Sequence, residues 1–113
     1  MNVPDKWVIL EFDNNGKKLY KVFAGWYGGY LDGDSWKLNS GIVETTFADE
    51  MYVFKGYSGS EYHCAKDNYG ISMLMSSILV SFQKQVDEAE GVALRILSQE
   101  DVKGLVGIVY CED

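Results

Sequence analysis

Two short runs in the first quarter of the chain have hydrophobic and polar patterns that are typical of β-strands. Residues 7–12 are dense in β-forming side chains, as a short half-buried strand should be, and the strand pattern resumes over residues 18–26, where hydrophobic and polar positions alternate. Residues 13–16, Asp-Asn-Asn-Gly, lie between the two runs, and an Asn-Gly pair suits a turn because both residues tolerate positive φ angles. The pattern therefore predicts a β-hairpin.

Three further short strands are expected after this hairpin, over residues 36–46, 51–56 and 61–65. Turn-forming residues separate them at 47–50 and 57–60. Residues 39–41, Asn-Ser-Gly, lie inside the first of these strands and suggest a bulge or a close backbone approach. Residues 25–36 mix glycines with Tyr, Trp and Asp and have no regular period, so we expect a loop there.

The second half of the chain opens with an amphipathic helix. Apolar residues from Ile71 to Ala89 follow the 3.6-residue period of a helix, and Gly91 suits the position just after its end. Residues 92–97 are typical of one more strand. Ser98 is a good N-cap for a short helix that runs to about residue 106. Residues 107–110 fit either the end of that helix or a last strand.

Together these elements predict a single α+β domain over residues 1–113. An antiparallel sheet of four to six strands packs one face against the long amphipathic helix at 70–90, and a short second helix follows near 99–106. At about 25 cal/mol per Å² of buried apolar area, this packing contributes on the order of several kcal/mol. The helix–sheet contact should therefore dominate the fold.

The composition adds a marked negative charge. The chain has 17 Asp and Glu against 10 Lys and Arg, a net charge of −7, which argues against a surface that grips nucleic-acid phosphates. Residues 1–56 carry 8 acids and 6 bases, a net of −2, and residues 57–113 carry 9 and 4, a net of −5. We expect an acidic surface formed by Asp87, Glu88, Glu90, Glu100 and Asp101. Such a surface either keeps the protein solvated or docks on a basic site of another protein.

The ends of the chain and its cysteines indicate the compartment. The N-terminus lacks the basic and apolar regions of a signal peptide, and serines interrupt the longest apolar stretch, residues 71–82. We therefore expect a cytoplasmic protein that does not enter a membrane. Two cysteines are too few for a disulfide scaffold, so free thiols are expected, although a bridge between Cys64 and Cys111 stays possible.

No residue pattern predicts catalysis, a metal or a cofactor. Gly56-Tyr57-Ser58-Gly59-Ser60 lacks the last glycine of a nucleophile elbow. His63 and Cys64 are neighbours on an expected strand, so they point to opposite faces, with Cys64 buried and His63 exposed. Asp32-Gly33-Asp34 matches no calcium-loop spacing and is also an ordinary turn sequence. We expect a protein that is not an enzyme.

The loop at 25–36 holds the best candidates for partner binding. Exposed Tyr and Trp side chains are typical anchors of protein interfaces, because they offer a large and rigid contact area. The candidate residues are Trp26, Tyr27, Tyr30, Asp32, Asp34 and Trp36. Trp26 and Trp36 also fit a role at strand ends, where they would cap the core. Stacking on a nucleotide base is less favoured, because only Lys37 supplies a nearby cation.

Residues 25–42, GWYGGYLDGDSWKLNSGI, and residues 56–64, GYSGSEYHC, resemble small acidic accessory proteins of tailed, T-even-like bacteriophages. The resemblance lies in the short, Tyr-rich and Gly-punctuated style of the chain, and it brings no catalytic residues. It implies a bacteriophage protein that acts in the cytoplasm of a bacterial host. Many such proteins are inhibitors that bind and block a host enzyme or a defence complex.

Three hypotheses for function follow. The first is a non-enzymatic protein that occludes a bacterial host protein, for instance a nucleic-acid-processing or defence complex, through the aromatic loop and the acidic surface. The second is a small-ligand-binding protein or enzyme with a pocket between the sheet and the loop, where Tyr30, Asp32, Asp34 and His63 supply polar groups. The third is a homo-oligomeric structural component.

Overall fold

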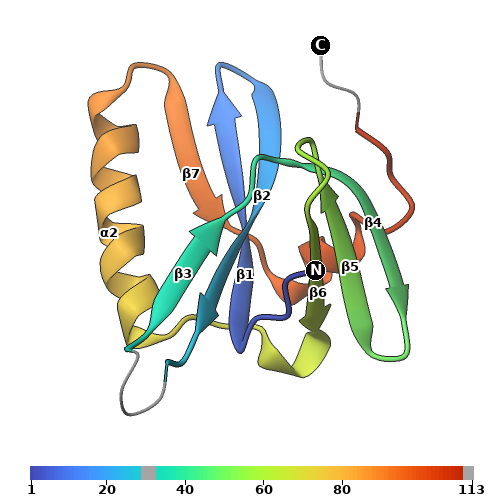
Figure 1. The fold of residues 1–113 in the computed structure, drawn as a ribbon. Coiled ribbons are helices and arrows are strands. Elements are labelled where there is room, and N and C mark those ends of the chain that lie inside the picture. The colour runs from blue at the N-terminus through green and yellow to red at the C-terminus, as the bar shows by residue number, and fades with distance from the viewer. Residues whose placement is uncertain (29–32, 111–113) are drawn as a thin grey trace.

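The computed structural model of the protein describes residues 1–28 and 33–110. Within these ranges the chain is α+β, as the sequence predicts (Figure 1). The strands are β1 (Lys6–Asn14), β2 (Lys17–Trp26), β3 (Ser35–Leu38), β4 (Ile42–Ala48), β5 (Met51–Gly56), β6 (Glu61–Ala65) and β7 (Val92–Ile96). The helices are the short 3-10 helix η1 (Lys66–Asn68) and the α-helices α2 (Met73–Glu88) and α3 (Gln99–Lys103).

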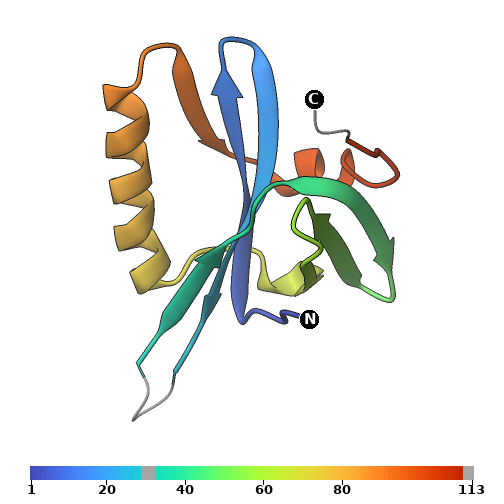
Figure 2. The same ribbon diagram turned by 45° about the horizontal axis from the view of Figure 1, so that its top comes forward.

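The strands form two antiparallel sheets, whereas the sequence pattern predicted one. The larger sheet has the order β3-β2-β1-β7, and the smaller has the order β4-β5-β6. Helix α2 covers one face of the larger sheet, and the smaller sheet and α3 lie against its other face (Figures 1 and 2). The long helix therefore packs on a sheet as expected, but the fold has a third layer that the sequence pattern did not predict.

The central strand β1 supplies both cores of the molecule. Its side chains alternate between the faces of the larger sheet, so Val8 and Leu10 pack with Phe23 of β2 and Met75 of α2. Trp7 and its neighbours on the opposite face join the core shared with the smaller sheet and α3. All residues from 7 to 11 are buried. This explains why the sequence here is a continuous apolar run instead of a clean alternation.

Where the sequence predicted one strand over 36–46, the structure has two strands in different sheets. The break falls at Asn39, whose side-chain Oδ1 accepts a hydrogen bond of 2.8 Å from the Val22 N–H. The Asn39 N–H donates in turn to the Val22 carbonyl at 3.0 Å. Gly41 then has a φ of 137°, a conformation that favours glycine. After these two hydrogen bonds to Val22 of β2, the chain crosses to the smaller sheet. The bulge predicted at residues 39–41 is therefore a crossing between the two sheets.

The hairpins agree with their turn sequences. Asn15 and Gly16 both have positive φ and form the two-residue connection between β1 and β2, which confirms the first predicted hairpin. Asp49 and Glu50 form an equivalent connection between β4 and β5. The predicted turn at 47–50 is therefore shorter in the structure, because β4 continues to Ala48.

Both helices begin at a serine cap, of which the sequence predicted Ser98 and not Ser72. The Ser72 hydroxyl accepts a hydrogen bond from the Met75 N–H at the start of α2, and the Ser98 hydroxyl accepts one from the Asp101 N–H at the start of α3. Helix α3 ends at Lys103 and is shorter than predicted. The following segment turns along β4, where the Tyr110 N–H donates to the Val43 carbonyl. Within the described residues, neither helix has the combined length and apolarity needed to cross a membrane.

Replacement of Thr45 by Val is expected to stabilise the protein by about 1 kcal/mol. The Thr45 hydroxyl is fully buried and has no hydrogen-bond partner among the described residues. Valine has nearly the same shape and removes the unsatisfied group. Urea unfolding measures the difference, and Thr45→Ala, which leaves a cavity, should gain less. A less stable Thr45→Val protein would show that a buried water satisfies the hydroxyl.

Candidate functional site

Four of the six residues predicted for partner binding are described, and all four lie on the β2–β3 hairpin. Trp26 ends β2 and pairs with Ser35, while Trp36 lies in β3 opposite Gly25. Tyr27 and Asp34 lie just beyond the paired residues. Tyr30 and Asp32 lie outside the described residues.

The two tryptophans of this hairpin have different surroundings. The Trp26 indole N–H donates to the Val3 carbonyl at 2.9 Å, and the ammonium of Lys37 lies 5.9 Å from the centre of the indole ring. Trp36 instead packs edge-on against Phe23 and Phe82 and remains 38% exposed. Trp26 therefore fastens the N-terminal segment to the hairpin. Trp36 has one edge in the core and the other open to a partner.

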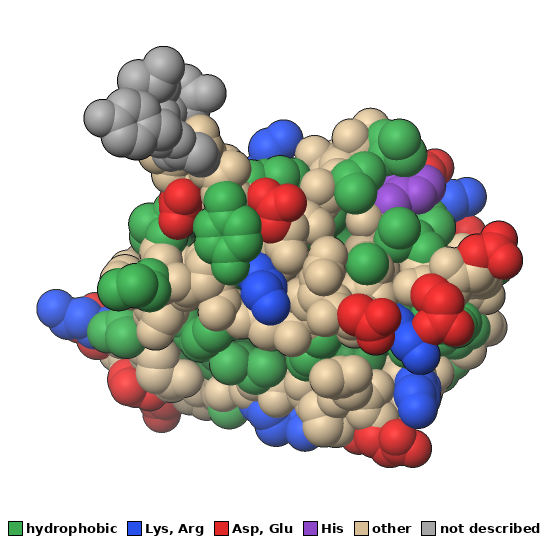
Figure 3. Space-filling model, turned by 90° about the horizontal axis from the view of Figure 1, so that it is seen from below, with side chains coloured by type: hydrophobic (Ala, Val, Ile, Leu, Met, Phe, Trp, Pro, Cys, Tyr) green, Lys and Arg blue, Asp and Glu red, His purple; other side chains and the backbone are tan. Residues whose placement is uncertain are grey.

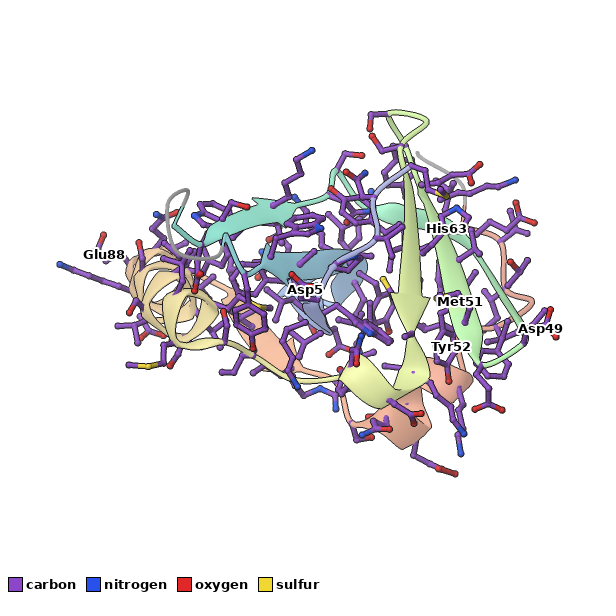
Figure 4. All side chains as sticks on the ribbon, turned by 60° about the horizontal axis from the view of Figure 1, so that its bottom comes forward. Asp5, Asp49, Met51, Tyr52, His63 and Glu88 are labelled. Carbon is purple, nitrogen blue, oxygen red and sulfur yellow. The ribbon has the colours of Figure 1, made fainter. Side chains whose placement is uncertain are left out.

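Tyr27 is the most exposed aromatic residue of the hairpin, and its backbone is held in place. Its side chain is 55% exposed, while its N–H donates to Asp5 Oδ2 at 2.8 Å. Asp5, which lies just before β1 (Figure 4), also donates its own N–H to the Gly25 carbonyl at 2.9 Å. A rigid backbone with an exposed ring reduces the entropy lost on binding.

The start of α2 extends this apolar surface. A side-chain carbon on Gly25 would come within 2.5 Å of Met75 Sδ, so β2 and the first turn of α2 are in direct contact. Two residues of this region, Ile71 and Met73, are exposed, Met73 by 89%. We call Tyr27, Asp34, Trp36, Ile71 and Met73 the hairpin surface. Seen from below, hydrophobic side chains lie among acidic ones on this side of the molecule (Figure 3).

The acidic residues expected to share one surface occupy two separate places. Asp87, Glu88 and Glu90 lie at the end of α2, and Glu100 and Asp101 lie in α3. These helices cover opposite faces of the larger sheet. The α3 acids have local partners, since Asp101 Oδ2 lies 3.1 Å from Arg95 and Glu100 lies 3.7 Å from Lys103. Neither group adjoins the hairpin surface.

A row of three polar side chains crosses the larger sheet, and sequence reasoning missed it. Glu11 of β1 is opposite Arg95 of β7 on one side and Tyr20 of β2 on the other. The Arg95 guanidinium donates to both oxygens of the buried Glu11 carboxylate, at 3.2 and 3.0 Å, and also to Asp101 of α3. Arg95 therefore joins β1, β7 and α3. The single acid inside the apolar run at 7–12 was the signal for it.

The pKa values in this row follow from these contacts. The hydrogen bonds from Arg95 lower the pKa of the Glu11 carboxyl, against the opposing effect of burial. Burial and the adjacent Glu11 charge raise the pKa of Tyr20 to about 12. Glu11 is therefore ionised and Tyr20 is neutral at pH 7. Because the charges satisfy each other, this row holds the strands and α3 together and leaves no free acid or base.

Among the described residues, Cys64, His63 and Ser58 form no nucleophile–base pair with one another. Cys64 is fully buried, as predicted, and burial raises the pKa of its thiol, whereas a reactive cysteine needs a lowered one. His63 is on the opposite face of β6 and is half-buried there, not exposed as predicted, with Nε2 3.1 Å from Glu61 Oε1. The Ser58 hydroxyl contacts only the hydroxyls of Ser40 and Ser60 among the described residues.

Of the polar groups of the predicted ligand pocket, the two described ones, Asp34 and His63, are not brought together. His63 lies on the smaller sheet, far from the β2–β3 hairpin that carries Asp34 (Figures 1 and 4). In the part of the chain that the structure describes, no three His, Cys, Asp or Glu residues are close enough to hold a metal ion. Asp32 of the Asp32-Gly33-Asp34 segment lies outside the described residues.

Known proteins supply no template for these arrangements. Comparison of the chain with protein-family models, with curated proteins and with solved structures found no match. Its own geometry separates two features. The Glu11–Arg95 row is satisfied internally and has a structural role, while the hairpin surface presents large side chains to the solvent.

Glu11→Gln should make the stability of the protein less dependent on acid pH. The ionised Glu11 stabilises the fold fully above its usual pKa of 4.5, and this contribution is lost as the pH falls through the lowered value of the folded state. The melting temperature of Glu11→Gln should therefore be lower than wild type at pH 7 and should converge with it below pH 4.5.

The matched control for this experiment is Glu100→Gln, which removes the same charge from an exposed position on α3. Its melting curves should follow those of the wild type at every pH. Parallel wild-type and Glu11→Gln curves across the acid range would show that the Arg95 contact does not lower the Glu11 pKa.

Proposed function

We propose that the protein is a non-enzymatic binding protein whose hairpin surface docks on a partner protein and occludes it. One observation supports this most strongly. The Tyr27 ring is more than half exposed on a backbone that Asp5 holds by a 2.8 Å hydrogen bond, on the same hairpin as the partly exposed Trp36. Large aromatic side chains on a fixed backbone are the usual centres of binding energy in protein interfaces.

The charge of the chain favours a partner with a basic docking site. The carboxylates of Asp5 and Asp34 flank the Tyr27 backbone, at 2.8 Å from its own N–H and 3.3 Å from the N–H of Gly28. The whole chain carries a net charge of −7, which accelerates encounter with a positive surface. The resemblance to small acidic phage proteins supports a partner among bacterial host proteins, which the protein would meet in the host cytoplasm.

Tyr27→Ala and Trp36→Ala should each weaken binding to that partner by about tenfold or more. The whole protein first serves as bait in a bacterial lysate, and mass spectrometry identifies what it retains. Isothermal titration calorimetry with the purified partner then gives the affinity of each variant. Phe47→Ala is the matched control, because Phe47 is about as exposed as Trp36 but lies on β4 of the smaller sheet.

Circular dichroism melting checks that each variant is folded. Equal affinity of wild type, Tyr27→Ala and Trp36→Ala would place the interface elsewhere. Retention of a second copy of this chain alone, with a size that depends on concentration, would favour the homo-oligomeric component.

Salt should slow association with the partner. Exposed charges are screened over about 10 Å at 0.1 M salt and over about 3 Å at 1 M, so steering by the net negative charge of the chain weakens across this range. Stopped-flow measurements should show the association rate fall at least tenfold between these conditions while the dissociation rate changes little. An association rate that is independent of salt would leave the apolar side chains as the sole basis of recognition.

A further inference from the structure

A groove lies at the opposite end of β2 from the hairpin surface. Strand β3 pairs only with residues 23–26 of β2, so residues 17–21 continue past the β3–β4 connection with β1 as their neighbour (Figure 1). The groove along this part of the β1–β2 hairpin has a volume of about 630 Å³. Sites for small molecules have volumes of roughly 300–1,000 Å³, so it is large enough for one.

The charge of the groove is opposite to that of the chain. Lys17, Lys18 and Lys21 line it, and no Asp or Glu does so among the described residues. Three of the 10 cationic residues of a chain with a net charge of −7 therefore gather at one place. Such a concentration of positive charge favours an anionic ligand.

The floor between the lysines is apolar. Phe12 and Leu19 are opposite each other in the β1–β2 pairing and share a face of the sheet. Leu19 and Tyr57 both lie within 3 Å of the position of a side-chain carbon on Gly41, at 2.9 and 2.7 Å, so they adjoin each other there. Phe12, Leu19 and Tyr57 therefore form a row.

The lysines are placed on either side of this row. Lys17 and Lys21 are two positions before and after Leu19 on the same face of β2. The Lys21 ammonium lies 5.7 Å from the centre of the Phe12 ring. Lys18 approaches from the other face, where its ammonium is 4.0 Å from Glu11 Oε2. A ligand in the groove thus meets an apolar floor and cationic walls at once.

We propose that this groove binds a nucleotide, with its base on the Phe12–Leu19–Tyr57 row and its phosphates beside the lysines. An inorganic anion would use only the lysines, and an uncharged aromatic compound would use only the floor. A nucleotide has both a planar apolar part and several negative charges. Stacking on aromatic side chains and charge-assisted hydrogen bonds from Lys are the contacts that such ligands make with proteins.

Calorimetry on the full chain tests the proposal, with ATP, adenosine and inorganic tripolyphosphate as separate probes. ATP should bind saturably, and the other two should each bind at least tenfold more weakly. Lys21→Gln and Lys18→Gln should each weaken ATP binding by about tenfold, because each removes a charged contact to phosphate. Lys84→Gln removes the same charge from the exposed side of α2 and should leave ATP binding unchanged.

Two-dimensional NMR of the labelled protein locates the probe. ATP should shift the amide signals of residues 12–21 and Tyr57 and leave those of Tyr27 and Trp36 unchanged. Absence of saturable ATP binding below about 1 mM would overturn the proposal. So would equal affinity for tripolyphosphate and ATP, or an equal loss in Lys84→Gln. Because the hairpin surface lies at the other end of β2, Tyr27→Ala should retain ATP binding even where it abolishes partner binding.

Discussion

The burial of β1 on both faces is the constraint on which the rest of the structure depends. Trp7 and Ile9 enter one core, and Val8 and Leu10 enter the other. The same strand pairs with β2 along one edge and with β7 along the other. Both sheet neighbours, the long helix and the second sheet thus rest on one nine-residue strand. A polar residue at any of the four positions would disturb a core, and the one acid of this stretch, Glu11, is accepted because Arg95 lies directly opposite it.

The sequence predicts local structure well here and the arrangement of layers poorly. The β1–β2 hairpin and the Ser98 cap of α3 depend on neighbouring residues, so periodicity and turn chemistry were sufficient to predict them. The separation of β3 from β4 depends instead on a bond between Asn39 and Val22, which are 17 positions apart. Alternation of side chains is the same whether a strand continues in its sheet or crosses to another. A single sheet was therefore the simpler prediction, and it was wrong.

The candidate sites show the same division. Exposed aromatic residues in a glycine-rich segment could be recognised from composition, and Tyr27 and Trp36 are indeed exposed on one hairpin. The contribution of the N-terminal segment could not be recognised from the sequence, because the hydrogen bond from the Tyr27 N–H to Asp5 joins residues 22 positions apart. The acidic residues illustrate the opposite error. They are near each other in the sequence, yet α2 and α3 carry them to opposite faces of a sheet. Charge counted along a chain is not charge gathered on a surface.

The hairpin surface and the lysine-lined groove share strand β2, which raises the question of whether they influence each other. Coupling between two sites needs an element with two arrangements that each ligand biases. Between the sites, Val22, Phe23 and Ala24 are fully buried and lie in the middle of a four-stranded sheet. The side chain of Asn39 accepts the hydrogen bond of the Val22 N–H. Nothing in this stretch offers a second arrangement of comparable energy, because a shift of register by one residue would turn Phe23 out of its core. The structure therefore favours two independent sites on one rigid strand. Binding of a ligand in the groove would not change the affinity of the hairpin surface for its partner.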